Sequence, residues 1–413
     1  MSAKTIEATA STPGIADGDT AEELAGAVLA GVGGELLSFR VRQVDHQPAA
    51  GTTATYAARV RWADESVTDE LLGAVDGALP DGVARLSDGQ TEVGMWRFPY
   101  DPELPALPAA CDPERMRRLA ASLGLGDGPV TTRVRSYRPR RRAVVEVRSG
   151  GRAVFVKVLR GTAKGEHRAH ALHERHRLAR AAGCPVPESL GWTDDGLVVL
   201  AAMPGNTLRQ VLTAGQPGEL DIDEVPRMLA TLPAELAEFG RRRTWGQRAA
   251  HYAAILGSIV PEFAGRAGKV ATAVDHDRPE GPDVAVHGDF YESQLLVHQG
   301  SISGLLDIDT AGKGERLDDA GCLLGHLSVL AQIHLDHAPV IDRLCARLRA
   351  RFQRELCPAA LDRRAAAVVL SLATGPHRVQ EAEWQTKTGQ RIGLAERWLE
   401  CAGRDWPVGH QRP

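Results

Sequence analysis

The sequence has few cysteines, and none of them is spaced to bind a metal ion. The six cysteines lie far apart, without a CxxC pair or the spacing of a zinc site. Cytosolic chains rarely keep disulfides, so we interpret these residues as reduced and mostly buried thiols. They are Cys111, Cys184, Cys322, Cys345, Cys357 and Cys401.

The sequence also lacks an excess of basic residues and long hydrophobic runs. Its net charge of −4 and pI of about 6.4 do not favour nucleic-acid binding, although arginines cluster at 138–142. No apolar run reaches the roughly 18 residues of a membrane span. The N-terminus has neither the cationic start nor the apolar stretch of a signal peptide. We therefore predict a cytoplasmic protein without a nucleic-acid or membrane partner.

Lysine is scarce, because nearly all basic residues are arginines. Lysine stands only at positions 4, 157, 164, 269, 313 and 387. Lys157 lies inside the apolar run "AVFVKVL", where a charged side chain is unusual. This residue is therefore a candidate for function.

The length of the chain allows a large core and more than one domain. With 413 residues, 43% of them hydrophobic, we expect two or three domains. Composition and periodicity divide the chain into a disordered tail (1–20), an N-terminal cap module (21–112), a sheet lobe (113–205), a helical lobe (206–405) and a C-terminal tail (406–413).

The N-terminal module has the pattern of a small α+β unit. Residues 21–32 have helical periodicity, and strands are expected at 36–44, 52–62 and 91–99. The proline-rich stretch 98–113 is predicted to be irregular, and a helix is predicted to follow at 114–124. This stretch is the predicted boundary of the module.

The next region is predicted to form a five-stranded antiparallel sheet with one helix. Three strands joined by the turns "RPRRR" and "RSGGR" place Val154, Val156 and Val158 on one face and Lys157 on the other. A helix at 163–182 and two further strands around the "DDG" turn complete this sheet lobe. Long helices follow, so the predicted fold class is α+β, a sheet lobe before a helical lobe with a cleft between them.

The stretch "VHGDFYESQLLVHQGSISGLLDID" (286–309) carries the clearest chemical pattern. Two apolar segments flank "HQGS", which predicts a hairpin centred near Gly300 with Gln294 and Asp307 facing each other at its base. Asp289 precedes the first strand closely enough to lie over the same point. One carboxylate and one amide oxygen suit Mg²⁺, and the remaining carboxylate is then available to accept a proton. A solvated polar hairpin is the alternative interpretation.

These residues resemble the aminoglycoside phosphotransferase and maltokinase-like small-molecule kinases, which share the protein-kinase-like fold. "HGDFYESQ" matches the family's catalytic loop HGDxxxxN, and "LLDID" matches the Asp one hairpin later. The resemblance covers about 131–400. It implies ATP and Mg²⁺ as co-substrate and cofactor, a catalytic base at Asp289 with His287 orienting the loop, and a principal metal ligand at Asp307.

The same resemblance assigns the nucleotide-binding residues. Lys157 is similar to the lysine that holds the α- and β-phosphates, and Glu174 to its partner on the helix, with Glu166 as the alternative. Met203 belongs to "MPGNTL", which resembles the turn after the hinge, and Asp319 resembles a structural aspartate downstream.

The sequence departs from the family pattern at two points. Gln294 replaces the commoner asparagine, and we expect its longer side chain still to reach the metal. No GxGxxG is present, and "SYRPRRRA" occupies the place of the nucleotide-covering loop. Its arginines are interpreted either as phosphate contacts or as a solvated turn.

The acceptor is expected to be a small sugar-like molecule, with an amino sugar or aminocyclitol favoured. The cap module resembles an addition found in the maltokinase and glucosamine-kinase branch. In "GPHRVQEAEWQ", Trp384 is suited to stack on a sugar ring, and Glu381 and Glu383 to bind its hydroxyls or amines. Packing of Trp384 between helices is the alternative. A pseudokinase and a metal-dependent hydrolase are the rival functions.

Overall fold

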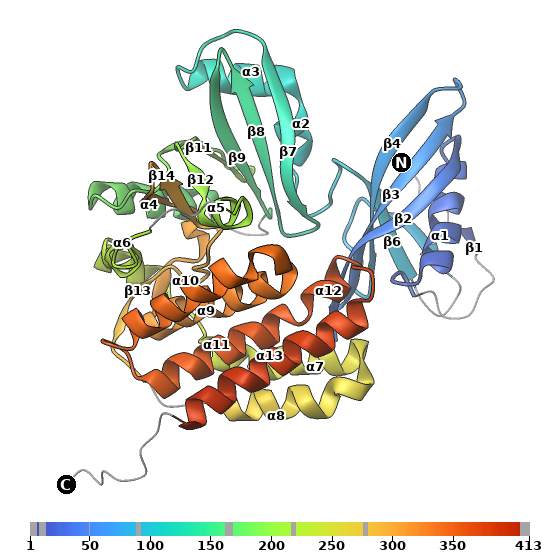
Figure 1. The fold of residues 1–413 in the computed structure, drawn as a ribbon. Helices are drawn as coiled ribbons and strands as arrows, with labels where there is room; N and C mark the ends of the chain where they lie inside the picture. Colours follow the sequence, from blue (N-terminus) through green and yellow to red (C-terminus); the bar gives the residue numbers. More distant parts are fainter. Residues whose placement is uncertain are drawn as a thin grey trace. The chain divides into compact units, whose positions relative to one another are not determined.

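The computed structural model describes residues 6–7, 14–48, 50–87, 92–161, 168–215, 220–275 and 280–404. The chain forms two compact units, shown as a ribbon in Figure 1. The first comprises Met1–His170, Leu190–Ala201 and His377–Ala382, and the second Ala171–Ser189, Ala202–Pro376 and Glu383–Pro413. None of the described helices has the length and apolar character needed to cross a membrane.

The N-terminal module of the first unit is a six-stranded sheet with one helix. The strand order is β1-β5-β6-β4-β3-β2. Alternate residues of β3, among them Ala54 and Tyr56, form a buried core with Leu24 and Leu29 of α1. The elements are β1 (Ile6–Glu7), α1 (Gly18–Ala30), β2 (Gly34–Gln47), β3 (Gly51–Trp62), β4 (Val67–Asp76), β5 (Ala84–Ser87) and β6 (Glu92–Arg97).

The structure adds elements that the sequence pattern did not predict in this module. β4 contains Asp, Glu and Gly, which are depleted in strands, but it pairs with β3 on one side and β6 on the other. Ordered packing also begins before residue 20, because Ile15 is buried in the core and its carbonyl accepts a hydrogen bond from Tyr56. The stretch 98–113, predicted to be irregular, contains the short helix α2 (Leu107–Cys111).

The five-stranded antiparallel sheet predicted after the module is confirmed. Its order is β10-β11-β9-β8-β7, and Val154, Val156 and Val158 contribute to a separate core beneath α2 and α3. Lys157 lies on the other face, as the alternation predicts, and is only 8% exposed. The elements are α3 (Pro113–Ser122), β7 (Val130–Arg138), β8 (Arg142–Ser149), β9 (Arg152–Leu159), β10 (Ser189–Trp192) and β11 (Leu197–Ala201).

The second unit is mostly helical, and α11 lies at its centre. Almost every residue of α11 is buried, because the helix packs against α7, α8, α9 and α13. The helices are α4 (Arg168–Ala181), α5 (Leu208–Thr213), α6 (Glu224–Ala230), α7 (Trp245–Ile259), α8 (Ala264–Val274), α9 (Arg316–Ile333), α10 (Ala338–Phe352), α11 (Pro358–Leu372), α12 (Gly375–Arg378, which spans both units) and α13 (Trp384–Arg404). Helix α4 falls within the helix predicted at 163–182, and residues 163–167 of that prediction lie outside the described residues.

Two small sheets in this unit hold the stretch 286–309. β12 (Asn206–Thr207) pairs with β14 (Leu295–His298), which pairs with β15 (Ser301–Leu305). β13 (Asp283–Val286) pairs with β16 (Gly312–Glu315), so the chain enters and leaves the stretch through one pair of strands. The expected α+β class with antiparallel sheets is therefore confirmed.

Candidate active site

The predicted hairpin is present, and its turn has the expected centre. Leu295 pairs with Leu305 and His298 with Ser301, which leaves Gln299 and Gly300 as a two-residue loop. Both loop residues have positive φ, as a type I′ turn requires. The turn and a shift in pairing between Leu296 and Val297 together bring residues 294 and 306 to the base of the hairpin.

At that base, the two expected metal ligands lie close together along the backbone. The amide of Leu306, next to Asp307, donates to the carbonyl of Gln294 at 2.7 Å. Asp307 itself has φ 56° and ψ 50°, a left-handed conformation that costs free energy for a non-glycine residue. Such strain is often found where a side chain must point in one fixed direction.

His287 fixes the loop that carries Asp289. The imidazole is fully buried, and its Nε2 lies 2.8 Å from the carbonyl oxygen of Leu306, which can only accept. The other ring nitrogen, Nδ1, lies 3.3 Å from the amide of Asp289, which donates to it. Both ring nitrogens are therefore engaged, which favours the expected orienting role over proton transfer.

Asp319 holds the same loop from behind. This buried carboxylate accepts hydrogen bonds from the amides of His287 and Gly288, both at 2.8 Å. Gly288 has φ +82°, and a Cβ there would lie 2.8 Å from the carbonyl oxygen of Thr310. Glycine is thus required where the loop passes the residues after Asp307.

Tyr291 lies within electrostatic reach of both carboxylates. Burial raises the pKa of its hydroxyl, and the charges of Asp289 and Asp307 raise this pKa further. Both carboxylates therefore lie near Tyr291 in the second unit. Tyr291 is part of the quoted motif, but the pattern gave no reason to single it out.

Two residues of α9 next to Asp289 were also not predicted. Among the described residues, ligand atoms of Asp289, Cys322 and His326 lie within 4.8 Å of one another. The spacing 319, 322, 326 places them on one helix face, a signal that the sequence does contain. A thiol and an imidazole are poor ligands for Mg²⁺, so this set does not fit that ion, whereas the oxygens of Gln294 and Asp307 do.

The surroundings of Asp289 include neutral rings and arginines. Burial lowers the pKa of His326 to about 3, and its ring stacks on Tyr291 with centroids 4.2 Å apart. Burial and the charge of Arg248 lower the pKa of Arg242, and Asp289 opposes this shift. This side of the site is therefore not uniformly acidic.

The expected nucleotide-binding residues are distributed over both units. Lys157 lies on β9 in the first unit. Glu174 lies on α4 in the second, where its carboxylate binds Arg177 at 2.8 Å, and Glu166 lies outside the described residues. Met203 packs on the hairpin, since a Cβ on Gly304 would lie 2.6 Å from its Cε. The pairing of Lys157 with Glu174 stays a prediction.

The acidic-aromatic segment does interrupt two helices. Trp384 is the half-buried first residue of α13, and Glu383 before it has φ 55°. Glu381 lies in the part of the segment that belongs to the first unit. Their predicted contact with an acceptor stays a prediction.

The arginine turn at 138–142 binds neighbouring acids of the first unit. Arg141 binds Asp45 at 3.0 Å, and Arg140 binds Glu103 at 3.3 Å. The amide of Arg140 also donates to Asp101 at 2.8 Å. At least these two arginines therefore fasten the turn to the cap module and the connector, which differs from the solvated turn considered above.

The comparison with protein families decides the assignment. The model of the phosphotransferase enzyme family matches residues 136–368, which is more than half of the chain. The chain belongs to this family. As a member of it, the chain is a small-molecule kinase, an enzyme that transfers phosphate from ATP to a hydroxyl group.

No curated protein matches the sequence. Several solved structures resemble the chain at low sequence identity and with TM-scores below 0.5. A thermostable mutant of aminoglycoside phosphotransferase APH(4)-Ia is 16% identical, with a TM-score of 0.49, and the match covers 70% of this chain and 99% of that one. Macrolide 2'-phosphotransferase MphH from Brachybacterium faecium is 18% identical, with a TM-score of 0.41 and coverages of 72% and 100%. A choline/ethanolamine kinase family protein from Mesorhizobium loti is 18% identical, with a TM-score of 0.45 and coverages of 69% and 95%.

Proposed function

We propose that this phosphotransferase transfers the γ-phosphate of ATP to a hydroxyl of a small sugar-like acceptor, with Asp289 as the catalytic base. The observation that supports the proposal is the fixed loop. His287 accepts a hydrogen bond from the amide of Asp289, and Asp319 accepts from the amides of His287 and Gly288. The amide of Leu306, next to Asp307, donates to the carbonyl of Gln294. Phosphoryl transfer needs positioned groups more than covalent chemistry from the protein.

In the proposed reaction, the acceptor oxygen forms a bond to the γ-phosphorus. The bond between that phosphorus and the β–γ bridging oxygen breaks, and ADP leaves. Asp289 accepts the proton of the acceptor hydroxyl. Asp307 and Gln294 would hold Mg²⁺, which offsets the negative charge of the phosphates. Lys157 would hold the α- and β-phosphates, with Glu174 as its partner and Met203 beside the nucleotide.

We propose an acceptor with few amino groups. Arg242 and Arg248 lie on the side of Asp289, and the Nε atom of each is buried without a hydrogen-bond partner among the described residues. A polycationic acceptor would be repelled there by the two guanidinium charges, whereas a neutral or mono-amino acceptor would be repelled less. The flat Tyr291–His326 stack supports a ring-shaped acceptor. Trp384, Glu381 and Glu383 are the further acceptor contacts proposed from the sequence.

The decisive experiment incubates the full chain with ATP, Mg²⁺ and separate neutral sugars, amino sugars and aminocyclitols. The measurement is the gain of one phosphoryl group by the acceptor in mass spectra, alongside ADP release. We expect phosphorylation of a neutral or mono-amino sugar, lost in Asp289→Asn. Release of ADP with every acceptor unmodified would contradict the sugar acceptor.

The same experiment separates the rival functions. A pseudokinase would bind nucleotide without releasing ADP, and a metal-dependent hydrolase would act on an ester without ATP. The presence of Lys157, Asp289 and Asp307 together supports the kinase over both. Trp384→Ala tests the acceptor contacts separately, because it should raise the acceptor KM and leave ATP affinity unchanged.

A further inference from the structure

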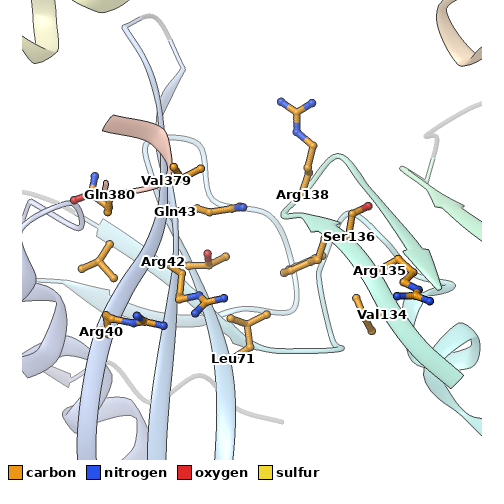
Figure 2. A pocket seen from close by; sticks show the side chains of 13 residues that line it. Arg40, Arg42, Gln43, Leu71, Val134, Arg135, Ser136, Arg138, Val379 and Gln380 are labelled. Carbon is orange, nitrogen blue, oxygen red and sulfur yellow. The ribbon is translucent and has the colours of Figure 1, made fainter. Parts of the chain in front are cut away.

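A pocket within the first unit contains none of Lys157, Asp289, Gln294 and Asp307, although it includes the start of the segment "SYRPRRRA". Its volume is about 590 Å³, within the range of ligand pockets, and it is lined by strands β2 and β7. Figure 2 shows Arg40 and Arg42 projecting from β2 and Arg135 and Arg138 from β7. Among the described residues that line it, none is acidic.

Both strands are irregular where they line this pocket. β2 shifts its pairing with β3 between Val41 and Gln43, and β7 shifts its pairing with β8 between Val134 and Ser136. A bulge of this kind redirects side chains, and bulges are frequent beside functional sites. On β2, Gln43 opposite Thr55 lies on the same face as Arg40, away from the core that contains Val44.

The arginines of the pocket differ in how their charge is balanced. Arg135 binds Glu146 at 2.6 Å. In the described part of the chain, Arg40, Arg42 and Arg138 form no ion pair, although most arginines around them do. Burial and the nearby charges of Arg378, Arg141 and Arg142 lower the pKa of Arg138, and the charge of Asp45 opposes this shift.

The pocket also has an apolar wall. Val134 and Val379 are two of the few large hydrophobic residues of the described chain that are exposed, and Leu71 lies with them. Gln380, next to Val379, has φ 51°, and its side chain donates to the carbonyl of His377. The backbone next to Val379 is therefore held in a fixed turn at the edge of a cationic surface.

We propose that this pocket binds a small organic phosphate. The phosphate would pair with Arg40 and Arg42, whose side chains project side by side from β2 in Figure 2, since a phosphate monoester carries about −1.5 to −2 charge and matches the fork of an arginine. The organic part would contact Val134 and Val379. The proposal does not rest on the proposed phosphotransfer, because Lys157, Asp289 and Asp307 do not line this pocket.

The test uses phenyl phosphate, with inorganic phosphate and phenol as its two halves. Each is titrated calorimetrically into the full chain without Mg²⁺ and without nucleotide. We expect saturable binding of phenyl phosphate, weaker binding of inorganic phosphate and none of phenol. The dissociation constant should rise about tenfold or more in Arg42→Gln and further in Arg40→Gln/Arg42→Gln.

Two further variants complete the test. Arg85→Gln removes an exposed arginine of β5 outside the pocket and should bind phenyl phosphate like the wild type. Val134→Ser should weaken the binding of phenyl phosphate but not that of inorganic phosphate. Thermal unfolding checks that each variant is folded. The proposal is wrong if the binding of phenyl phosphate does not saturate, or if Arg85→Gln weakens this binding as much as Arg42→Gln does. It is also wrong if inorganic phosphate binds as tightly as phenyl phosphate.

Discussion

Two hairpins of this protein carry its most conspicuous charged residues, and they use them differently. In the hairpin β14–β15, the residues of interest lie at the base, next to a loop whose backbone is held by buried groups. In the hairpin β7–β8, the arginines lie at the tip, where Arg140 and Arg141 bind acids of the cap module and connector.

The difference shows that the partners of a charged cluster decide its role. The "RPRRR" turn has the composition of a phosphate-binding loop, yet at least two of its arginines have carboxylate partners. Arg40 and Arg42, which stand out less in the sequence, have no ion-pair partner in the described part of the chain. The first hairpin is therefore expected to govern catalysis, and the tip of the second mainly the attachment of the cap.

The largest effect is expected at the base of the first hairpin, in Asp289→Asn. The amide keeps the shape of the side chain but cannot accept the proton, so kcat should fall by about 10² to 10⁴-fold. Nucleotide affinity should stay unchanged, and Asp336→Asn, an exposed control in the same unit, should be fully active. Activity within a few-fold of the wild type would exclude Asp289 as the base.

Asp307→Ala should weaken nucleotide binding only when Mg²⁺ is present. Removal of a metal ligand should cost at least about tenfold in the affinity for Mg·ATP, measured by calorimetry. Gln294→Ala should give a smaller loss, because an amide oxygen binds the cation less strongly than a carboxylate. An equal loss of affinity with and without Mg²⁺ would show that Asp307 does not act through the metal.

Asp319→Asn tests whether the rigid loop behind Asp289 matters. The amide can no longer accept from both backbone amides, so we expect a loss of about 1–3 kcal/mol in the free energy of unfolding. If the loop positions Asp289, kcat falls more than the KM values change at temperatures where the variant is folded. Unchanged kcat in a destabilised variant would mean that Asp319 serves stability alone.

The sequence was sufficient to predict the hairpin and the sheet. The "HQGS" turn and the alternation around Lys157 are local patterns, and local patterns determine register and face. The helix between the third and fourth strands of this sheet was also predictable, because Gly183 and the prolines after it mark where it ends.

Other features depend on contacts between distant segments, which a single sequence does not show. β4 is stabilised by pairing on both sides rather than by its own composition. Cys322 and His326 reach Asp289 only because α9 packs behind the loop. The arginine pocket requires β2 and β7, which are separated by about ninety residues of sequence, to line the same space.

Asp318, the neighbour of Asp319, should make stability depend on pH. Burial raises the pKa of Asp318 to about 6, against 3.8 for the unfolded state. The folded state favours the protonated carboxyl. The contribution of Asp318 to the free energy of unfolding is therefore fully present below pH 4 and is lost as the pH rises to about 6.

In Asp318→Asn, which resembles the protonated form, this loss should be absent. The free energy of unfolding of the variant minus that of the wild type should increase by on the order of 2 kcal/mol between pH 4 and 6. Above pH 6 this difference should stay constant. Urea unfolding at several pH values measures it, with Asp336→Asn as the control. A difference that does not change with pH would show that Asp318 is ionised in the folded state throughout.

The smallest effect is expected at the tip of the second hairpin, in Arg141→Ala. The partly exposed pair with Asp45 should contribute less than about 1 kcal/mol to the free energy of unfolding. Arg140→Ala should cost more, because its side chain is less exposed and also reaches Thr53. Neither change should alter the affinity for Mg·ATP, because both side chains already have partners in the first unit. If Arg141→Ala weakens nucleotide binding tenfold while stability is unchanged, the turn binds phosphate after all, and the two hairpins would both serve the reaction.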